Sequence, residues 1–590
     1  MNTLNRDRGA VLLMVLVMAI VVGGFCVVSL LVSGTESRGA NRAILRDRAL
    51  FVAQSGLEDQ FKTLNDMKQS ASPLSPFLAF DALKGTLPIQ RRPLVSDGLT
   101  IGEYTVAIDC VTALDPFSRD ITVSATGWVP SASDPQAVEH TVTAVVRLTV
   151  GRSQVFDYVY FINNWGWYYG ATIYANGNIR ANGQFDFGGY AATVNGIPRF
   201  ESVAADGSVG AKIDDGGIYA GWNVINYNGV KGQTNGKGSM HSYDEQIPMP
   251  NLTDLTLYES AGKTANSNIK IGGVVMCNSV AGDETGELSN LYLEGTATNP
   301  IELNGTVVVR GNLIIKGYVK GKGSLYVKGN IYVAGNIIYS NPPQNVPSSL
   351  DQHKLQEYLR RKEQTEADAL GLFAREHIVV SDYTDPTWQW YVSQWVYDKR
   401  NGSEEDAGED GIPNTRAGKD GIRNTADDDV LEDDHTWTVD HYKAGDKLPA
   451  GANVGDAIPG SGEDIDGDGT YDPTVSMSEF NIPVALKKDN WAGNFPSVLP
   501  VTYRSLCASG HNISRIDAAF YTNHSFAMLT LTPGDMNFNG CVVSRNESIV
   551  YGAKKLNFNY DPRLLMESGP HGLDLPRTWQ PMRMVMWTSN

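Results

Sequence analysis

The stretch from Ala10 to Val32 constrains the fold most, because it runs for 23 residues without a charged side chain. At about 1.5 Å per residue a helix of that length spans roughly 35 Å, which is enough to cross the hydrocarbon core of a bilayer. A secretory signal has a shorter apolar run followed by a small-x-small cleavage site. No clear site of that kind follows Val32. Arg6 and Arg8 precede the span and favour a cytoplasmic N-terminus, with most of the chain outside the cytoplasm.

The helical pattern continues beyond this span. The next charged residue is Glu36, and apolar residues then recur at spacings of three to five, which indicates an amphipathic helix. This predicted stripe consists of Leu45, Leu50, Ala53, Leu57, Phe61 and Leu64. The sequence therefore predicts one helix with an apolar front and an amphipathic rear. A plain single-pass anchor remains an alternative interpretation.

Two short phrases carry a family resemblance. The leader MNTLNRDRG ends at Gly9, and ALFVAQSGLE occupies Ala49 to Glu58. Over its first 60 or so residues the chain resembles type IV pilin-like proteins, and PilX-type minor pilins in particular. The resemblance implies that a prepilin peptidase cuts between Gly9 and Ala10. It also implies that the mature helix packs among other pilin-like subunits. Most major pilins carry Glu at the fifth mature position, where this chain has Met14, so the repeating filament subunit is the less favoured role.

Composition and patterning predict a mainly β body. A chain of 590 residues is long enough for two or more cores, and its 60 glycines and 26 tyrosines favour turn-rich β structure. Within residues 100–150, EYTVAIDCV, DITVSATGWV and EHTVTAVVRLTV alternate as strands. We expect a long N-terminal transmembrane and amphipathic α-helix, a small β domain, and a β-solenoid (β-helix) head with an acidic insertion.

A glycine period predicts the solenoid. Glycines fall six residues apart, with β-branched and aromatic residues between them, at Gly305, Gly311, Gly317, Gly323, Gly329 and Gly335. Short strands joined by glycine corners would stack into coils, about three six-residue faces to a coil. An ordinary series of glycine-rich hairpins is the alternative.

The patterns divide the chain into seven segments. A helix with Ser349 as N-cap and Leu370 near its end is expected inside the fifth segment. The segments are a basic leader (1–9), the pilin-like helix (10–70), a small β domain (71–155), the β-solenoid (156–345), a helix and strand (346–400), an acidic insertion (401–480) and a C-terminal β region that completes the solenoid (481–590).

Charge and cysteine content restrict the partners. The net charge is −18, and residues 401–475 hold 20 acidic against 5 basic side chains. The rest of the chain is close to neutral, which argues against a nucleic-acid partner. Of five cysteines, Cys26 lies in the apolar span, and no CxxC motif suggests a zinc or redox site. Cys507 and Cys541 form a candidate disulfide for an oxidising compartment.

The acidic segment contains a candidate calcium loop. In EDIDGDGTYD, Asp464, Asp466 and Asp468 alternate before Gly469, Thr470 offers a carbonyl, and Asp472 follows. This spacing is typical of the first part of an EF-hand-like loop, although Val475 replaces the usual Glu. It resembles the DxDxDG loops of dockerin and thrombospondin-type repeats. A solvated acidic linker is the alternative to calcium binding.

No catalytic motif stands out. HExxH, GxSxG and Walker sequences are absent from the 590 residues. Asp517, Glu547 and Asp561 are candidates by residue type only, and His524 is expected to be structural. The aromatic run FDYVYFINNWGWYYG, which begins at Phe156, is either a core layer or an exposed shelf for a carbohydrate or protein partner.

Three functional hypotheses follow. The first, which we prefer, is a non-catalytic minor pilin-like protein that acts in pilus or pseudopilus assembly or in adhesion. It would lie in the bacterial inner membrane before assembly and at the cell surface afterwards, where the head could contact a surface glycan or protein. The second is a membrane-anchored, calcium-dependent, β-helical enzyme acting on glycans. The third is a structural envelope protein.

Overall fold

The computed structural model divides the chain into two compact units. Unit 1 comprises residues 1–150 and 579–590, and unit 2 comprises residues 151–578. The structure describes residues 4–589 with the exception of 70–76, 84–90, 97, 116, 164–165, 169, 222, 233–239, 253–254, 283–286, 345, 347–350, 397–479, 481, 483–484, 497–500, 546, 553 and 568–571.

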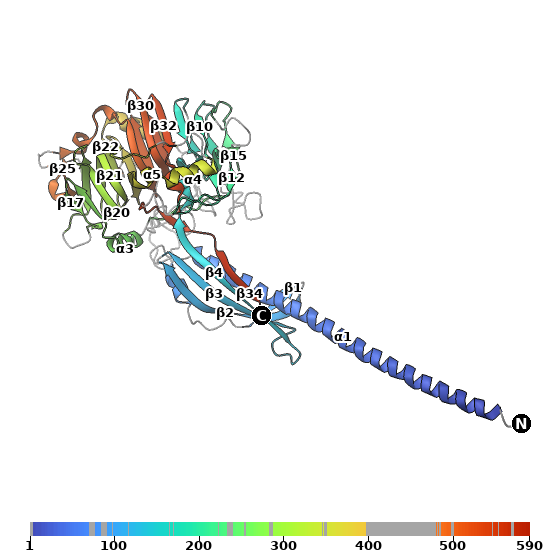
Figure 1. Ribbon diagram of the computed structural model, residues 1–590. Helices are drawn as coiled ribbons and strands as arrows, with labels where there is room; N and C mark the ends of the chain where they lie inside the picture. Colours follow the sequence, from blue (N-terminus) through green and yellow to red (C-terminus); the bar gives the residue numbers. More distant parts are fainter. Residues whose placement is uncertain are drawn as a thin grey trace, which may run out of the picture. The chain divides into compact units, whose positions relative to one another are not determined.

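Unit 1 is a long helix on an antiparallel sheet. Helix α1 (Leu4–Gln69) extends far beyond the sheet at its N-terminal end (Figure 1). A short helix, α2 (Leu78–Asp81), follows it. The strands pair in the order β1, β2, β3, β4, β33 (Arg577–Trp579), with β34 also on β4. Their bounds are β1 Arg92–Ser96, β2 Leu99–Asp115, β3 Ser118–Val129, β4 Val138–Arg152 and β34 Arg583–Ser589.

The three strands predicted within residues 100–150 are β2, β3 and β4. Strands β3 and β4 alternate between buried and half-exposed residues over most of their length, because one face of the sheet packs on α1 and the other faces away. The sequence pattern predicts that the end of the chain completes the solenoid. Residues 579–590 belong to unit 1 instead, where β34 pairs antiparallel with β4.

Unit 2 is a stack of β coils. Its principal strands are β5 Tyr160–Ile162, β7 Ile173–Asn176, β8 Ile179–Ala181, β10 Thr193–Asn195, β13 Ile218–Ala220, β15 Met240–His241, β20 Ile301–Val309, β21 Leu313–Val327, β22 Ile331–Tyr339, β23 Ala369–Ala374, β24 Ile378–Val380, β28 Arg515–Thr522, β29 Ser525–Thr530, β30 Asp535–Ser544, β31 Glu547–Gly552 and β32 Lys555–Tyr560. Nearly all of these strands pair in parallel with strands of the neighbouring coils. The mainly β class with a long N-terminal apolar helix is confirmed.

The register of the coils matches the glycine period. Ile301 pairs with Val319, and Leu313 pairs with Ile331, both 18 residues apart. That step equals three six-residue faces. Only Gly305 and Gly317 of the six glycines have positive φ, at 78° and 96°. Gly323 is needed for a different reason: a Cβ there would lie 2.6 Å from the carbonyl oxygen of Gly305 in the next coil.

The coils do not stack in chain order. One column of parallel strands runs β20, β21, β23, β28, β30, β5, β8, β13, β15. The chain therefore enters this column at its middle, at β5, and winds to one end at β15. It then crosses to the other end and winds back until β30 pairs with β5 (Figure 1).

Unit 2 also contains helices, which lie between its strands in the chain. They are α3 Thr256–Thr264, α4 Gln352–Arg360, α5 Lys362–Glu366, α6 Pro386–Val396 and α7 Tyr503–Leu506. The N-cap of α4 is Asp351, whose side chain accepts a hydrogen bond from the Lys354 amide, and Ser349 lies outside the described residues. Leu370, which the sequence pattern assigns to that helix, belongs to β23 instead.

The candidate disulfide between Cys507 and Cys541 is not formed. Cys507 and Cys541 are both free. Cys541 packs inside the coils, whereas Cys507 borders a separate cluster around Trp388 and Tyr503. Because the two side chains belong to different cores, the fold does not bring their sulfurs together.

Candidate functional site

Helix α1 presents two different surfaces along one rod. Fifteen apolar residues between Leu13 and Val32 are 49–74% exposed, and this window has the length and composition needed to cross a membrane. Beyond it, Ala49, Val52 and Leu64 are fully buried against the sheet of unit 1. All six residues of the predicted amphipathic stripe belong to this cluster, so the amphipathic prediction is confirmed.

The helix lies unusually close to the sheet at one point. A Cβ at Gly127 of β3 would lie 2.5 Å from the carbonyl oxygen of Ala49 and 2.6 Å from the amide nitrogen of Ala53. Only glycine allows the two backbones to approach so closely. The small residues Ala49, Ala53 and Gly127 therefore fix the rear of α1 on β3.

Two of the predicted sites cannot be compared with the geometry. Gly9 and Ala10 lie within α1, and cleavage between them stays a prediction. The calcium loop, formed by Asp464, Asp466, Asp468, Thr470 and Asp472, lies outside the described residues. Within the part of the chain that is described, no group of three His, Cys, Asp or Glu side chains is placed to hold a metal ion.

A polar cleft opens on the coil stack. Its volume is about 330 Å³. It brings together two of the three carboxylates predicted by residue type, Asp517 and Asp561, whereas the side chain of Glu547 lies outside the described part. The lining residues are Tyr339, Pro342, Pro343, Val346, Arg515, Asp517, Asn537, Asn539, Asn559, Tyr560 and Asp561.

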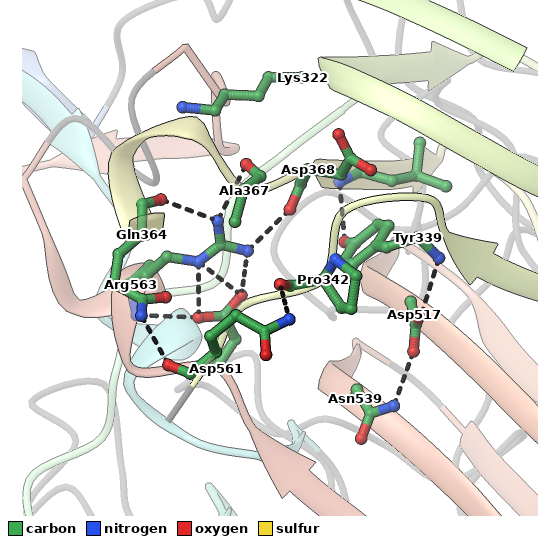
Figure 2. A network of polar contacts seen from close by, with 12 residues as sticks. Lys322, Tyr339, Pro342, Gln364, Ala367, Asp368, Asp517, Asn539, Asp561 and Arg563 are labelled. Atoms are coloured by element: carbon green, nitrogen blue, oxygen red, sulfur yellow. Dashed lines mark hydrogen bonds and ion pairs between the residues drawn. The ribbon is translucent and has the colours of Figure 1, made fainter. Parts of the chain in front are cut away.

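Asp517 is fully buried in the wall of the cleft and fully hydrogen-bonded. It accepts the backbone amide of Tyr339 at 2.8 Å and the Asn539 amide at 2.6 Å (Figure 2). Arg515 adds an ion pair at 2.8 Å. Because its charge is neutralised and its lone pairs are used, Asp517 acts as an anchor for the cleft wall rather than as a base.

Asp561 is held by a buried arginine. Arg563 contacts both of its carboxylate oxygens and donates to the backbone carbonyls of Gln364, Ala367 and Asp368 (Figure 2). Burial alone lowers the pKa of Arg563, but the carboxylate of Asp561 outweighs it and raises that pKa. Asp561 thus orients Arg563, whose hydrogen bonds to these carbonyls link the turn after β32 to the segment before β23.

A second constellation was not visible in the sequence. The Ser381 hydroxyl lies 2.7 Å from Nδ1 of His511, whose Nε2 lies 3.5 Å from Asp385. Ser381 has a φ of 80°, a strained value for a side-chain-bearing residue. The arrangement has the residue types of a serine hydrolase, but Ser381 is completely buried and accepts no substrate in this conformation. We regard it as a polar link beneath the surface.

The aromatic run and His524 are structural. Phe156, Tyr158, Tyr160, Phe161 and Tyr168 are all buried inside the coils, so the core interpretation holds for these rings, whereas Trp167 is half-buried and Trp165 and Tyr169 lie outside the described residues. His524 is buried with its ring 4.3 Å from that of His377.

Comparison with known proteins adds one likeness. No protein-family model and no curated protein matches the chain. Among solved structures, the chain is similar to the competence-associated pilin ComZ from Thermus thermophilus, with 11% sequence identity and a TM-score of 0.29. The match covers 93% of this chain and 98% of that chain. A likeness at this score carries no argument about function, so the proposals below rest on the geometry described above.

Proposed function

We propose that this protein is a membrane-anchored, pilin-like subunit that assembles with other pilin-like subunits through the front of α1. The main support is the contrast between the two parts of α1. Its rear, around Ala49 to Leu64, is buried on the sheet of unit 1, whereas its front, Leu13 to Val32, is apolar and exposed. Burying one large apolar side chain contributes about 1.5–3 kcal/mol. Fifteen such residues on a free rod therefore require a bilayer or neighbouring helices around them.

The order of the units along the chain supports a display role. Unit 2 is inserted between β4 and β34 of unit 1, so the sheet that holds α1 combines strands from before and after unit 2 in the chain. In this proposal the helix enters the inner membrane, a prepilin peptidase removes residues 1–9, and the coil stack is carried to the cell surface. The head would then determine what the assembly contacts.

We assign no reaction to the head. Both candidate carboxylates of the cleft are neutralised by arginines, and Ser381 is buried. A general acid or base needs a free lone pair or proton near its substrate, and a nucleophile needs access. The glycan-active enzyme thus has less support than the pilin-like subunit.

The leader provides the test. Replacing Gly9 with Leu should leave the precursor uncut and absent from material sheared from the cell surface, because the peptidase would no longer recognise the site. The control is Gly39→Leu, at an exposed position of α1 where an added Cβ would meet no other atom within 4 Å. Normal maturation of the Gly9→Leu variant would contradict the proposal.

A further inference from the structure

A ladder of side-chain amides crosses the coil stack. Asn539 donates to Asp517 at 2.6 Å, Asn559 to Asn539 at 3.0 Å, Asn176 to Asn559 at 2.8 Å, and Asn195 to Asn176 at 2.9 Å. These five residues, which we call the amide ladder, come one from each of five neighbouring strands. A shorter parallel rung joins Asn557 to Asn537 at 3.2 Å.

The amide ladder leaves hydrogen-bonding capacity unused. A side-chain amide has two N–H donors and two acceptor lone pairs. Each ladder hydrogen bond uses one donor of one residue and one lone pair of its neighbour. Strands in neighbouring coils lie about 4.8 Å apart, so the remaining donors and acceptors repeat at that spacing. Asn539 and Asn559 of the ladder, together with Asn537 of the shorter rung, line the cleft, whose volume is about 330 Å³. The volume lies within the range of small-ligand sites.

The charge of the cleft selects against ionic ligands. Asp517 is paired with Arg515, and Asp561 is paired with Arg563. Within each pair the positive and negative charges neutralise each other. The described lining residues therefore offer no unpaired charge to an anion or a cation. Pro342, Pro343 and Val346 add an apolar rim.

The strands around the cleft exclude peptide binding by strand addition. Strand β28 is paired on both sides, by β23 and β30, and β30 is paired by β28 and β32. A peptide recognised by strand addition needs an unpaired edge. The available groups are instead planar amides beside apolar rings, which match the hydroxyls and the apolar faces of a sugar.

We propose that the cleft binds a short segment of a neutral glycan, with sugar hydroxyl or acetamido groups on Asn537, Asn539 and Asn559 and a ring face on Pro342 and Pro343. This inference depends on unit 2 alone and stands apart from the assembly role of α1.

Asn537 and Asn195 provide a matched pair for the test. The side chain of each forms one hydrogen bond to an asparagine of a neighbouring coil, but only Asn537 lines the cleft. Binding of the full-length protein in detergent would be measured by calorimetry with neutral glucan and N-acetylglucosamine oligomers, with oligogalacturonate and with a neutral peptide. We expect a neutral oligomer to bind, Asn537→Ala to weaken it at least tenfold, and Asn195→Ala to change it less than twofold.

A second variant keeps the test valid if Asn537→Ala fails to fold. Val346 is half exposed at the rim, so Val346→Trp adds bulk to the cleft without disturbing the core, and it should also abolish binding. The inference is overturned if no neutral oligomer binds, if only oligogalacturonate or the peptide binds, or if the Asn537 and Asn195 variants bind equally.

Discussion

At the scale of single residues, Gly127 determines how α1 lies on its sheet. A methyl group there would press on the backbone of Ala49 and Ala53. Overpacking of this kind costs about 1–3 kcal/mol. We therefore expect Gly127→Ala to accelerate hydrogen exchange of β3 amides, measured by mass spectrometry. Gly39→Ala, at an open position of the same helix, should leave β3 unchanged, and equal exchange in both variants would refute the close approach.

His377 makes the coil stack sensitive to acid. Burial lowers the pKa of His377 to about 3, and its Nδ1 lies 2.6 Å from the Ser525 hydroxyl. In the unfolded chain its pKa is near 6.5, so the unfolded state binds more protons between these values and stability falls as the pH drops below 6.5. The loss from this residue is about 1.4 kcal/mol per pH unit.

The pH effect can be isolated with two variants. The free energy of unfolding, measured in urea between pH 7 and pH 5, should fall less steeply for His377→Gln than for the unaltered protein. His353→Gln, an exposed position on α4, should keep the original slope. Identical slopes for all three proteins would show that His377 is not the group responsible.

At the scale of elements, β34 closes the edge of the small sheet. It pairs with β4, and Trp579 just before it packs edge-on against Phe77 at 5.1 Å between ring centroids. Ending the chain after Thr578 should expose the β4 edge and speed hydrogen exchange of β4 amides at least tenfold, since an unpaired strand is protected poorly. The control is Trp587→Ser, which changes an exposed side chain and keeps the backbone pairing of β34. This variant should not speed the exchange of β4 amides. Unchanged β4 exchange in the truncated chain would contradict this role.

Elements with a local period could be predicted from the sequence. The amphipathic stripe of α1 and the six-residue glycine step both repeat over neighbouring residues, so their pattern alone identifies helix and coil. The order of the coils could not be predicted. Val542 pairs with Tyr160, which is far away in the chain, and a local sequence pattern does not say which distant coils are neighbours. The return of β34 to β4 could not be predicted either, because the two strands are separated in the chain by the whole of unit 2.

The cleft was only partly predictable. Residue type alone selects Asp517 and Asp561, and the structure places both in its wall. The amide ladder was missed, although a signal existed: the tripeptide Asn-Phe-Asn occurs at 537–539 and again at 557–559, twenty residues on. The coil from β30 to β32 is twenty residues long, so a polar residue repeated at that step indicates a ladder, but the contributions of Asn176 and Asn195 required the joining of distant coils.

At the scale of the whole molecule, calcium binding by the acidic insertion stays a prediction. Dense carboxylates repel one another unless a cation neutralises them, and extracellular loops of this kind bind calcium weakly, with dissociation constants of about 0.1–1 mM. We expect millimolar calcium, but not magnesium, to slow limited proteolysis between residues 401 and 480. Asp466→Ala should abolish this protection, whereas Asp440→Ala, outside the loop, should retain it. Equal cleavage with and without calcium would favour a solvated linker.

Photo-crosslinking in cells can show whether the apolar front of α1 packs against the helices of other subunits. A photoreactive residue would be placed at Met18, in the exposed apolar window, with Val274 as a similarly exposed control on unit 2. We predict that irradiated cells yield adducts between Met18 and other pilin-like subunits, and that the Val274 position yields none. Adducts of Met18 with lipid alone would show that α1 is a solitary membrane anchor and not part of an assembly.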